Sequence, residues 1–468
     1  GDINIPAGWN SVSLGEVSHK LVDGSHNPPK KKDSGLPMLS AININGNYIS
    51  YEPCRFISDE EFEAEHRRTL VRAGDVLLTI VGAIGRVAVV PENHQPFTLQ
   101  RSVAVIAPIQ IHSRFLMYQL ESPKSAKYFK ENSRGTAQKG VYLKTLSRLP
   151  LEIPSLNEQH RIVAKIEELF SELDRGIESL KTAREQLKVY RQALLKQAFE
   201  GKLTEQWRKE NVDRLETADQ LLERIKQERE TRYQQQMEAW KAAVKQWETD
   251  DKEGKKPRKP KKLQENILEQ DIVNELPNLL GVGVHAPLGD LIDEPKYGTS
   301  KKCTYNTNGN GVLRIPNVVS GRVDSADLKY AEFDDSELHD YVLVDGDVLL
   351  IRSNGSVSIV GKSALIEPKD TGFIYAGYLI RLRPNANLII SKYLLFSLEA
   401  HMLRKQIEAK AKSTSGVNNI NSGEIRALII PVVGLKEQSV IVGLLEEQLS
   451  VIDSSMFNVE NNVTIQRC

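Results

Sequence analysis

The sequence predicts an α+β protein in which two similar globular domains are separated by an antiparallel two-helix coiled coil. One observation behind this prediction is an internal duplication, in which short motifs recur in the same order after 272 to 279 residues. The other is a seven-residue apolar pattern in the segment that follows each copy. A repeat period this long excludes a solenoid and indicates a duplicated module with pseudo-two-fold symmetry.

The duplicated motifs extend through both copies. Gly74–Leu78 recurs as Gly346–Leu350, and Ser113–Leu116 recurs as Ser391–Leu394. The other matches pair Leu14-Gly15-Glu16 with Leu288-Gly289-Asp290, Gly140-Val141 with Gly416-Val417, Pro154 with Pro431, Glu158-Gln159 with Glu437-Gln438, and Ile162-Val163 with Ile441-Val442.

Each copy is predicted to be a mixed α+β domain. Short runs rich in β-branched residues and bounded by Gly, Pro or Asn predict strands. These runs are Val76–Ile80, Val87–Val90 and Val103–Ile106 in the first copy, and Val348–Ile351, Ala364–Ile366 and Leu379–Leu382 in the second. One helix is predicted to follow in each copy, over residues 113–130 and 391–410.

The segment Leu156–Phe199 is predicted to be one long helix. Its apolar residues recur at seven-residue steps, at Ile166, Leu173, Leu180, Leu187 and Leu194. This heptad seam is typical of a coiled coil, and 44 residues would make a rod of roughly 65 Å. The alternative is a long amphipathic helix that belongs to the core of a globular domain.

The second copy repeats the seam at Leu445, Ile452 and Val459 in a shorter helix, which reads as truncated at Cys468. An antiparallel pairing would then leave Leu187, Tyr190 and Leu194 uncovered. Because burying one Leu side chain contributes roughly 1.5–3 kcal/mol, we expect another chain to cover this end. That chain would be a second copy, giving a homodimer, or a different subunit.

Residues 202–275 differ from both copies and predict a polar linker with a helix over 215–247. Its segment Gly254–Lys262 holds six cations in nine residues, and two prolines prevent a regular helix there. Two interpretations remain open, a solvated linker and an arm that contacts phosphates.

Composition excludes several classes of protein. The 62 basic and 62 acidic residues cancel, so any nucleic-acid site must be a local patch. Three widely spaced cysteines argue against a disulfide framework and favour the cytoplasm. There is no apolar stretch near the ~20 residues that cross a membrane, and no signal peptide is recognisable.

No catalytic or metal-binding constellation is found in the sequence. It lacks a phosphate-binding loop and the H-E-x-x-H pattern, and the histidines are scattered. Asn27-Pro28-Pro29-Lys30 resembles a methyltransferase motif, but Lys30 stands where an aromatic residue would stack on a flipped base. We therefore expect no enzyme activity and no metal from this chain.

Local loops offer the better candidates for a binding site. Arg and Lys can bond guanine edges or phosphates, and Asn and Gln can bond adenine edges. The candidate DNA-binding residues are Lys30, Lys31, Lys32, Arg134, Gln138 and Lys139 in the first copy, and Lys301, Lys302, Arg352, Asn354, Lys412, Asn418 and Asn419 in the second. Ordinary polar surface loops are the alternative for each of them.

Over nearly its whole length the sequence resembles the specificity subunits of Type I restriction-modification enzymes. The resemblance is carried by Ile5–Trp9, by Pro154–Val163 at the start of the long helix and by Leu194–Leu203 at its end. It implies target-recognition domains at 1–154 and 276–431, coiled-coil helices at 155–201 and 432–468, and a linker at 202–275. The second copy lacks the Gly-Trp pair of the first, so we expect its domain entry to differ.

The resemblance also implies the partners. Each domain would read one half of a split double-stranded DNA target, and the chain would recruit two modification subunits together with restriction subunits. AdoMet, ATP and Mg²⁺ would be used by those subunits, with no cofactor bound by this chain. The candidate subunit contacts are Leu173, Leu180, Leu187, Tyr190, Leu194, Ile452 and Val459. The alternative functions are a coiled-coil scaffold whose domains bind protein and a fused nuclease or methyltransferase.

Overall fold

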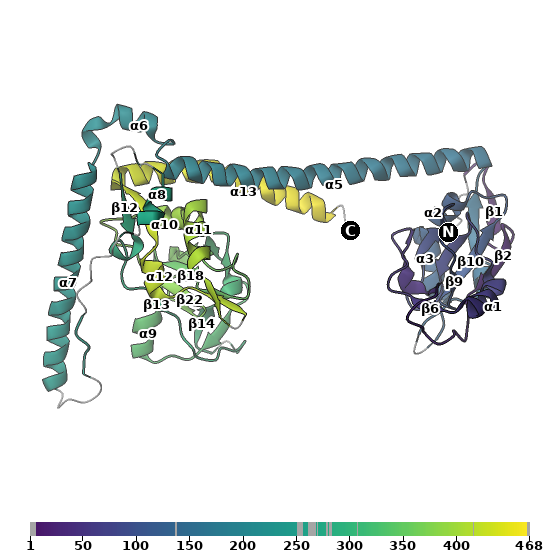
Figure 1. Ribbon diagram of the computed structural model, residues 1–468, viewed down its shortest axis with the longest axis horizontal. Helices are drawn as coiled ribbons and strands as arrows, with labels where there is room; N and C mark the ends of the chain where they lie inside the picture. Colours follow the sequence, from purple (N-terminus) through teal and green to yellow (C-terminus); the bar gives the residue numbers. More distant parts are fainter. Residues whose placement is uncertain are drawn as a thin grey trace. The chain divides into compact units, whose positions relative to one another are not determined.

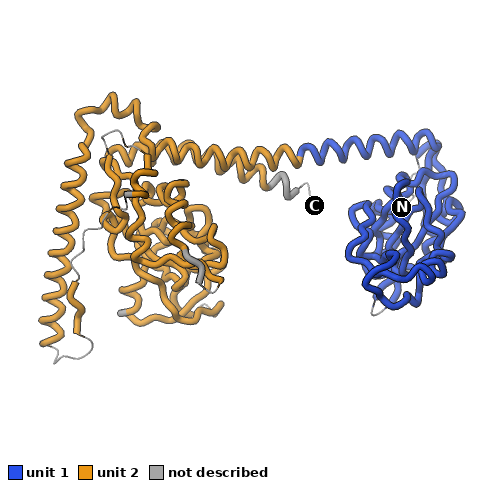
Figure 2. Tube along the Cα trace, in the orientation of Figure 1, with its two compact units in different colours: residues 1–176 blue, residues 177–468 orange. Residues whose placement is uncertain are grey.

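The computed structural model describes residues 6–135, 138–249, 256–260, 268, 270–277, 279, 283–306, 308–414 and 416–465. The chain forms two compact units, residues 1–176 and 177–468 (Figure 2). The division falls within the helix α5 (Leu156–Phe199). Within the described residues, no helix combines the length and apolar character needed to cross a bilayer.

The first unit is built around a four-stranded antiparallel sheet (Figure 1). Its strand order is β2 (Ser18–Asp23), β10 (Val103–Pro108), β7 (Val76–Thr79) and β8 (Val87–Val89). Smaller pairings join β6 (Arg55–Ile57), β3 (Leu36–Leu39) and β9 (Thr98–Leu99), β4 (Ile44–Asn45) with β5 (Tyr48–Ile49), and β1 (Asn10–Ser13) with β11 (Pro150–Ile153). Its helices are α1 (Asp59–Thr69), α2 (Ser113–Glu121), α3 (Pro123–Asn132), α4 (Leu143–Leu146) and the first part of α5.

The second unit repeats this topology, which confirms the predicted duplication. Its main sheet has the order β13 (Lys296–Tyr297), β22 (Leu379–Leu382), β18 (Val348–Ile351) and β20 (Ser363–Leu365). The equivalent smaller sheets are β17 (Lys329–Ala331), β14 (Asn310–Leu313) and β21 (Ile374–Tyr375), β15 (Val318–Val319) with β16 (Arg322–Val323), and β12 (Gly283–Pro287) with β25 (Ile429–Val433). A further sheet joins β19 (Ser353–Asn354), β24 (Val417–Asn419) and β23 (Lys412–Thr414).

In chain order, helices of the second unit come before, within and after this sheet module. Before it come the last part of α5, α6 (Glu205–Glu210), α7 (Ala218–Thr249) and α8 (Gln270–Glu275). Within it and after it come α9 (Asp335–Tyr341), α10 (Ser391–Glu399), α11 (His401–Lys410), α12 (Ser422–Arg426) and α13 (Leu435–Ile465). The helix predicted over 215–247 is α7.

Each main sheet is buried on both faces. Because side chains alternate along a strand, Val76 and Leu78 enter the core beneath α2, whereas Leu77 enters a second core on the other face. The same alternation separates Val348 and Leu350 from Leu349. The repeated Gly-Asp-Val-Leu-Leu motif is therefore the central strand of each module.

The aspartate of this motif closes the turn before the strand. Asp75 Oδ2 accepts a hydrogen bond from Arg72 N at 3.0 Å, and Asp347 Oδ2 accepts one from Val344 N at 3.0 Å. Each carboxylate also pairs with a cation, Lys20 of β2 in the first unit and Arg383, which directly follows β22, in the second.

The single helix predicted after the strands is wrong in both modules, because each consists of two helices. Residues 113–130 divide into α2 and α3 at Ser122, whose Oγ accepts from Ser125 N, and Pro123 has no N–H to continue the first helix. Residues 391–410 divide into α10 and α11 at Ala400, which is extended (φ −67°, ψ 141°) although no proline is present.

The repeated Glu-Gln pair fixes the start of the long helix in each unit. Gln159 Oε1 accepts from His112 N at 2.9 Å, and its Nε2 donates to Pro154 O at 3.0 Å. Gln438 makes the equivalent bonds with Ile390 N and Val433 O at 2.9 and 2.8 Å. A buried amide therefore ties each helix to its own sheet module.

The adjacent glutamates have different partners, and this explains the difference in domain entry. Trp9 Nε1 donates to Glu158 Oε1 at 3.3 Å in the first unit. The second unit lacks this tryptophan, and Arg208 Nη1 and Thr204 Oγ1 each donate to Glu437 Oε1 at 2.6 Å. The segment after α5 thus takes the place of the Gly-Trp pair.

The end of α5 and α13 pack antiparallel in the second unit, as the resemblance implied. Arg191 pairs with Asp453 at 2.7 Å, while Arg208, further along the chain, pairs with the earlier residue Glu437. Between these pairs, Leu194, Leu195 and Phe199 share a core with Leu445, Leu449 and Ile452.

The prediction that the Leu187–Phe199 end lacks cover is wrong for Leu187 and Leu194, whereas Tyr190 is 55% exposed. Leu194 is 3% exposed, Phe199 is 2% exposed and Leu187 packs against the same core. The reason is that the start of α13 and α10 cover this end, and Phe199 meets Tyr393 edge-on. Two of the three residues on which the homodimer argument rests, Leu187 and Leu194, are therefore covered within the second unit.

Candidate nucleic-acid interface

In the first module, backbone hydrogen bonds join four loops into one continuous strip. Ser25 is bonded to Leu99 O and to Arg101 N, Ile80 N donates to Ser102 O, and Val141 N donates to Ile80 O, all at 2.8–2.9 Å. Gly82 N donates to Lys139 O at 3.0 Å. We call this strip, residues 24–32, 80–82, 100–102, 134–135 and 138–140, the first polar edge.

The first polar edge includes the six candidates that the sequence placed in two separate loops. Lys30, Lys31, Arg134, Gln138 and Lys139 are exposed. Lys32 is also exposed and pairs with Glu61 at 3.1 Å. The basic loop of Lys30 is held by Arg55, which donates to Pro29 O, so its cations project from a fixed backbone.

A close approach of backbone fixes where this loop leaves the sheet. A Cβ on Gly24 would lie 2.2 Å from Leu99 O, and one on Gly298 in the second module would lie 2.3 Å from Ala376 O. Because no other residue fits, both loops begin at the same place relative to the strand beside them.

The second module builds the same strip from equivalent bonds. Thr299 is bonded to Tyr375 O and Gly377 N, Arg352 N donates to Tyr378 O and Ile420 N donates to Arg352 O, at 2.8–3.0 Å. Strand β19 then pairs with β24, placing Ser353 opposite Asn419 and Asn354 opposite Asn418. We call residues 298–302, 352–354, 376–378, 412–414 and 416–420 the second polar edge.

These bonds correct one detail of the sequence repeat. The sequence matched Val141 with Val417, but the residue that bonds to the strand end in the same way is Ile420. Counted from the end of the preceding helix, at Asn132 and Lys410, the second loop is only one residue longer, and it forms the β23–β24 hairpin.

Arg352 has the most defined geometry among the candidates. Its guanidinium lies 4.7 Å from the centroid of the Tyr297 ring and donates from Nη1 to Gly377 O at 3.0 Å. The Tyr297 hydroxyl accepts from Ser422 N at 2.8 Å, which fixes the ring. A stacked guanidinium keeps its charge and loses little freedom when it binds a second ligand.

Two asparagines of the second polar edge make hydrogen bonds to the backbone of the edge's own loops. Asn354 Oδ1 accepts from Ser356 N, and Asn418 Nδ2 donates to Gly355 O, both at 2.9 Å. Asn419 Oδ1 is buried and has no hydrogen-bond partner within the described residues.

The remaining candidates lie at the two ends of this edge. Lys301 Nζ donates to Glu332 O at 2.9 Å and to Glu337 Oε2 at 2.5 Å, so it also anchors α9. Lys302 is exposed. Lys412 lies in β23, and its side chain is outside the described residues.

Sequence reasoning missed three residues on these edges. Arg101 is exposed between the two loops of the first edge. Tyr378 is 62% exposed beside Arg352, and Tyr297 is 40% exposed beneath it. The duplication could have indicated the first two, because Arg101 and Tyr378 each lie one or two residues before the third predicted strand of their copy.

The edges have the chemistry of a binding surface. They combine exposed cations, amides and tyrosines, which suit phosphates and base edges. Across the part of the chain that the structure describes, no group of three His, Cys, Asp or Glu residues is placed to hold a metal ion. Burial raises the pKa of Tyr375, which supports the second edge and donates its hydroxyl proton to Lys296 O at 3.2 Å.

The family model described as the Type I restriction modification DNA specificity domain matches residues 6–188 and 287–456. The chain belongs to this family. The two matched regions contain the two polar edges, and they leave residues 189–286 outside the family's shared part.

Individual relatives agree with this assignment. The chain is 34% identical to the Type I restriction enzyme EcoBI specificity subunit of Escherichia coli over 235 residues, which cover 48% of this chain and 49% of that protein. The match therefore spans about half the length of that relative. The EcoKI specificity subunit of Escherichia coli (strain K12) is 22% identical over 466 residues, covering 98% of this chain and 85% of that protein.

Solved structures support the fold. The HsdS subunit from Thermoanaerobacter tengcongensis has a TM-score of 0.52 at 17% identity, covering 100% of this chain and 97% of that one. A chain from a study of complex assembly and conformational transition of the type I R-M system has a TM-score of 0.62 at 17% identity, covering 100% and 96%.

Proposed function

We propose that the chain is the DNA specificity subunit of a Type I restriction-modification enzyme. Each module reads one half of a split double-stranded DNA target through its polar edge. The observation that carries the proposal is that the two modules build the same backbone strip from equivalent hydrogen bonds and fill it with different side chains. A common scaffold with different cations and amides is what two different half-sites require.

The resemblance to Type I specificity subunits implies a division of labour. The chain positions DNA and binds no cofactor, while two modification subunits use AdoMet and restriction subunits use ATP and Mg²⁺ in the cytoplasm. The exposed apolar residues of α5 are the proposed contacts with the modification subunits. Leu173 is 37% exposed and Tyr190 is 55% exposed, and Leu180 on α5 and Val459 on α13 are half-buried.

Leu187, Leu194 and Ile452 are unsuited to that contact, because they pack within the second unit. Val189 is the better choice on this side of α5, at 70% exposed, and it lies with Tyr190 and Ala193 around an apolar hollow of about 610 Å³.

The test selects bound duplexes from a random pool with the chain assembled with its partner subunits, and sequences them. We expect a bipartite motif with a fixed gap. Arg352→Ala should relax one half-site and Arg101→Ala the other, each by about 1–3 kcal/mol of discrimination.

Two outcomes would contradict the proposal. If no duplex is enriched, the scaffold that binds protein becomes the better account. If the purified chain alone transfers methyl groups or cleaves DNA, the chain is itself an enzyme.

A further inference from the structure

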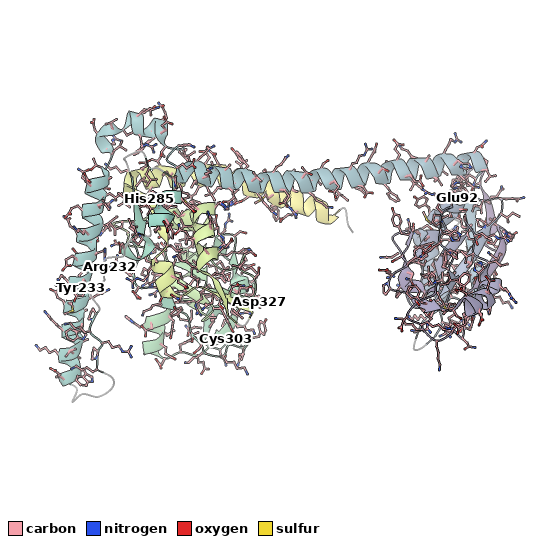
Figure 3. The ribbon with its side chains drawn as sticks, viewed as in Figure 1. Glu92, Arg232, Tyr233, His285, Cys303 and Asp327 are labelled. Carbon is pink, nitrogen blue, oxygen red and sulfur yellow. The ribbon has the colours of Figure 1, made fainter. Side chains whose placement is uncertain are left out.

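The second unit carries a helical arm that the polar edges do not use. The first half of α7 packs on the sheet module, with Leu221 and Ile225 buried and Arg232 Nη1 donating to Ile292 O at 2.6 Å. Figure 3 labels Arg232 and Tyr233 on α7, where this packing ends. We call the described residues 233–249 and 256–260 the arm.

A proline-rich segment returns along the arm and is clasped by two tryptophans. Trp240 Nε1 donates to Pro257 O at 3.0 Å. Lys259 Nζ lies 5.9 Å from the centroid of the Trp240 ring, and Lys256 Nζ lies 5.7 Å from that of Trp247.

The spacing of the two lysines along the proline-rich segment matches the spacing of the two tryptophans along α7. Pro257 and Pro260 fix their own φ and force the residues before them into an extended conformation, so the segment rises about 3.1 Å per residue. Three such residues span about 9.3 Å, and the seven helical residues from Trp240 to Trp247 span about 10.5 Å. Two lysines three residues apart therefore meet two tryptophans seven residues apart, in antiparallel order.

The surface of the arm is strongly cationic. Lys241, Lys245, Lys256, Arg258 and Lys259 are exposed, against the two carboxylates of Glu238 and Glu248. The stacked lysines keep their charge, because a cation–π contact does not take up the proton.

The arm also lacks the features of a protein-binding surface. Within residues 233–249 and 256–260, the large apolar side chains of Tyr233, Met237, Trp240, Val244 and Trp247 are all half-buried. Protein interfaces depend on exposed aromatic or apolar anchors, whereas contact with a phosphate backbone needs only well-placed cations.

We propose that the arm binds the phosphate backbone of duplex DNA outside the split target. The proposal rests on the proposed function for the identity of the polyanion, and it assigns a sequence-independent contact to a segment outside the family's shared part. The tryptophan clasp holds the cations in place before DNA arrives, which lowers the ordering cost of binding.

The first experiment compares two triple variants of the full chain. Lys256→Gln/Arg258→Gln/Lys259→Gln removes three charges from the arm, and Lys196→Gln/Lys202→Gln/Lys209→Gln removes three exposed charges from α5 and its continuation. Binding to duplexes with and without the selected target is measured between about 50 and 200 mM salt, the range in which phosphate contacts change affinity most visibly.

The arm variant should lower the slope of log K against log salt by about two to three, roughly one for each phosphate that the variant no longer neutralises. Its affinity at low salt should fall on the order of tenfold for both duplexes, so the ratio between them stays constant. The control variant should match the wild type.

The second experiment tests the clasp with the charges retained. Trp240→Ala/Trp247→Ala should speed tryptic cleavage after Arg258, because the next residue is Lys259 and not a proline. The same variant should weaken DNA binding. In the wild type, added duplex should slow this cleavage, as followed by mass spectrometry.

The outcomes separate this inference from the proposed function. If the salt slope of the arm variant is unchanged and the wild type still binds its target selectively, the proposed DNA contact of the arm is wrong. The proposal that the chain is a specificity subunit is then unaffected. Loss of assembly with partner subunits at unchanged DNA affinity also overturns the proposed DNA contact, in favour of a protein contact. If the wild type binds neither duplex, both proposals fall.

Discussion

Removing one member of the buried ion pair between Arg208 and Glu437 should destabilise the second unit severely. The two side chains are 8% and 3% exposed, and they join α6 to the start of α13. Arg208 also donates to Thr204 Oγ1 at 2.9 Å and to Gly201 O, so both of its Nη atoms are engaged. Glu437→Gln leaves a buried positive charge without its counter-charge.

The expected loss of folding stability follows from the burial of both charges. Breaking a buried pair on one side typically costs about 3–5 kcal/mol, because the remaining charge is deprived of both water and partner. Replacing both residues by apolar ones, as in Arg208→Met/Glu437→Leu, removes the uncompensated charge and should recover most of that loss. The exposed pair of Lys209 and Glu205 is the matched control, and Lys209→Met should leave the unfolding transition unchanged.

The assay is thermal unfolding of the full chain, followed by tryptophan fluorescence. The transition of the second unit should fall by about 2–4 °C for each kcal/mol of stability removed. If Glu437→Gln and the double variant are equally destabilised, the loss comes from packing and the reasoning about charge is wrong. If neither changes the transition, the pair does not join the two helices in solution.

The packing and burial of other residues support three further predictions. Leu194→Ala should destabilise the second unit by about 2–5 kcal/mol in urea unfolding, whereas the exposed Val189→Ala should have no measurable effect; equal effects would contradict the described core. Seven residues inserted into both α5 and α13 should lengthen each helix by about 10 Å. The gap between the half-sites should then widen by roughly three base pairs. An unchanged gap in the methylated motif would show that the helices are not the spacer. Burial, with His160 and Arg114 nearby, lowers the pKa of His112, so the unfolded chain binds more protons and the first unit should lose stability as the pH falls below about 6.5. His112→Asn should flatten this dependence of the urea midpoint on pH, and an unchanged slope would place its origin elsewhere.

Regular patterns in the sequence predicted the regular parts of the fold. The heptads of Leu156–Phe199 predicted α5 with its observed bounds, and the repeated Gly-Asp-Val-Leu-Leu motif predicted β7 and β18. Both succeed because apolar periodicity reports directly which face of an element is buried.

Apart from the helix break at Ser122, which Pro123 marks in the sequence, the main failures concern contacts between segments far apart in the chain. The cover over Leu194 and Phe199 comes from residues more than 190 positions away, which no local pattern reveals. Likewise, the polar edges arise from hydrogen bonds between loops, and the stacking of Arg352 on Tyr297 depends on how two strands approach. The candidate residues were recognisable by type, but their assembly into two strips was not.

The methylation motif of a genome that expresses this chain with its partner subunits tests the central claim most directly. Residues 8–154 are exchanged for the equivalent module of a relative, and modified bases are mapped before and after the exchange. We predict a bipartite motif with a fixed gap, in which the exchange alters one half and leaves the other half and the gap unchanged. A change in both halves, or a continuous motif, would contradict the claim that each module reads its own half-site.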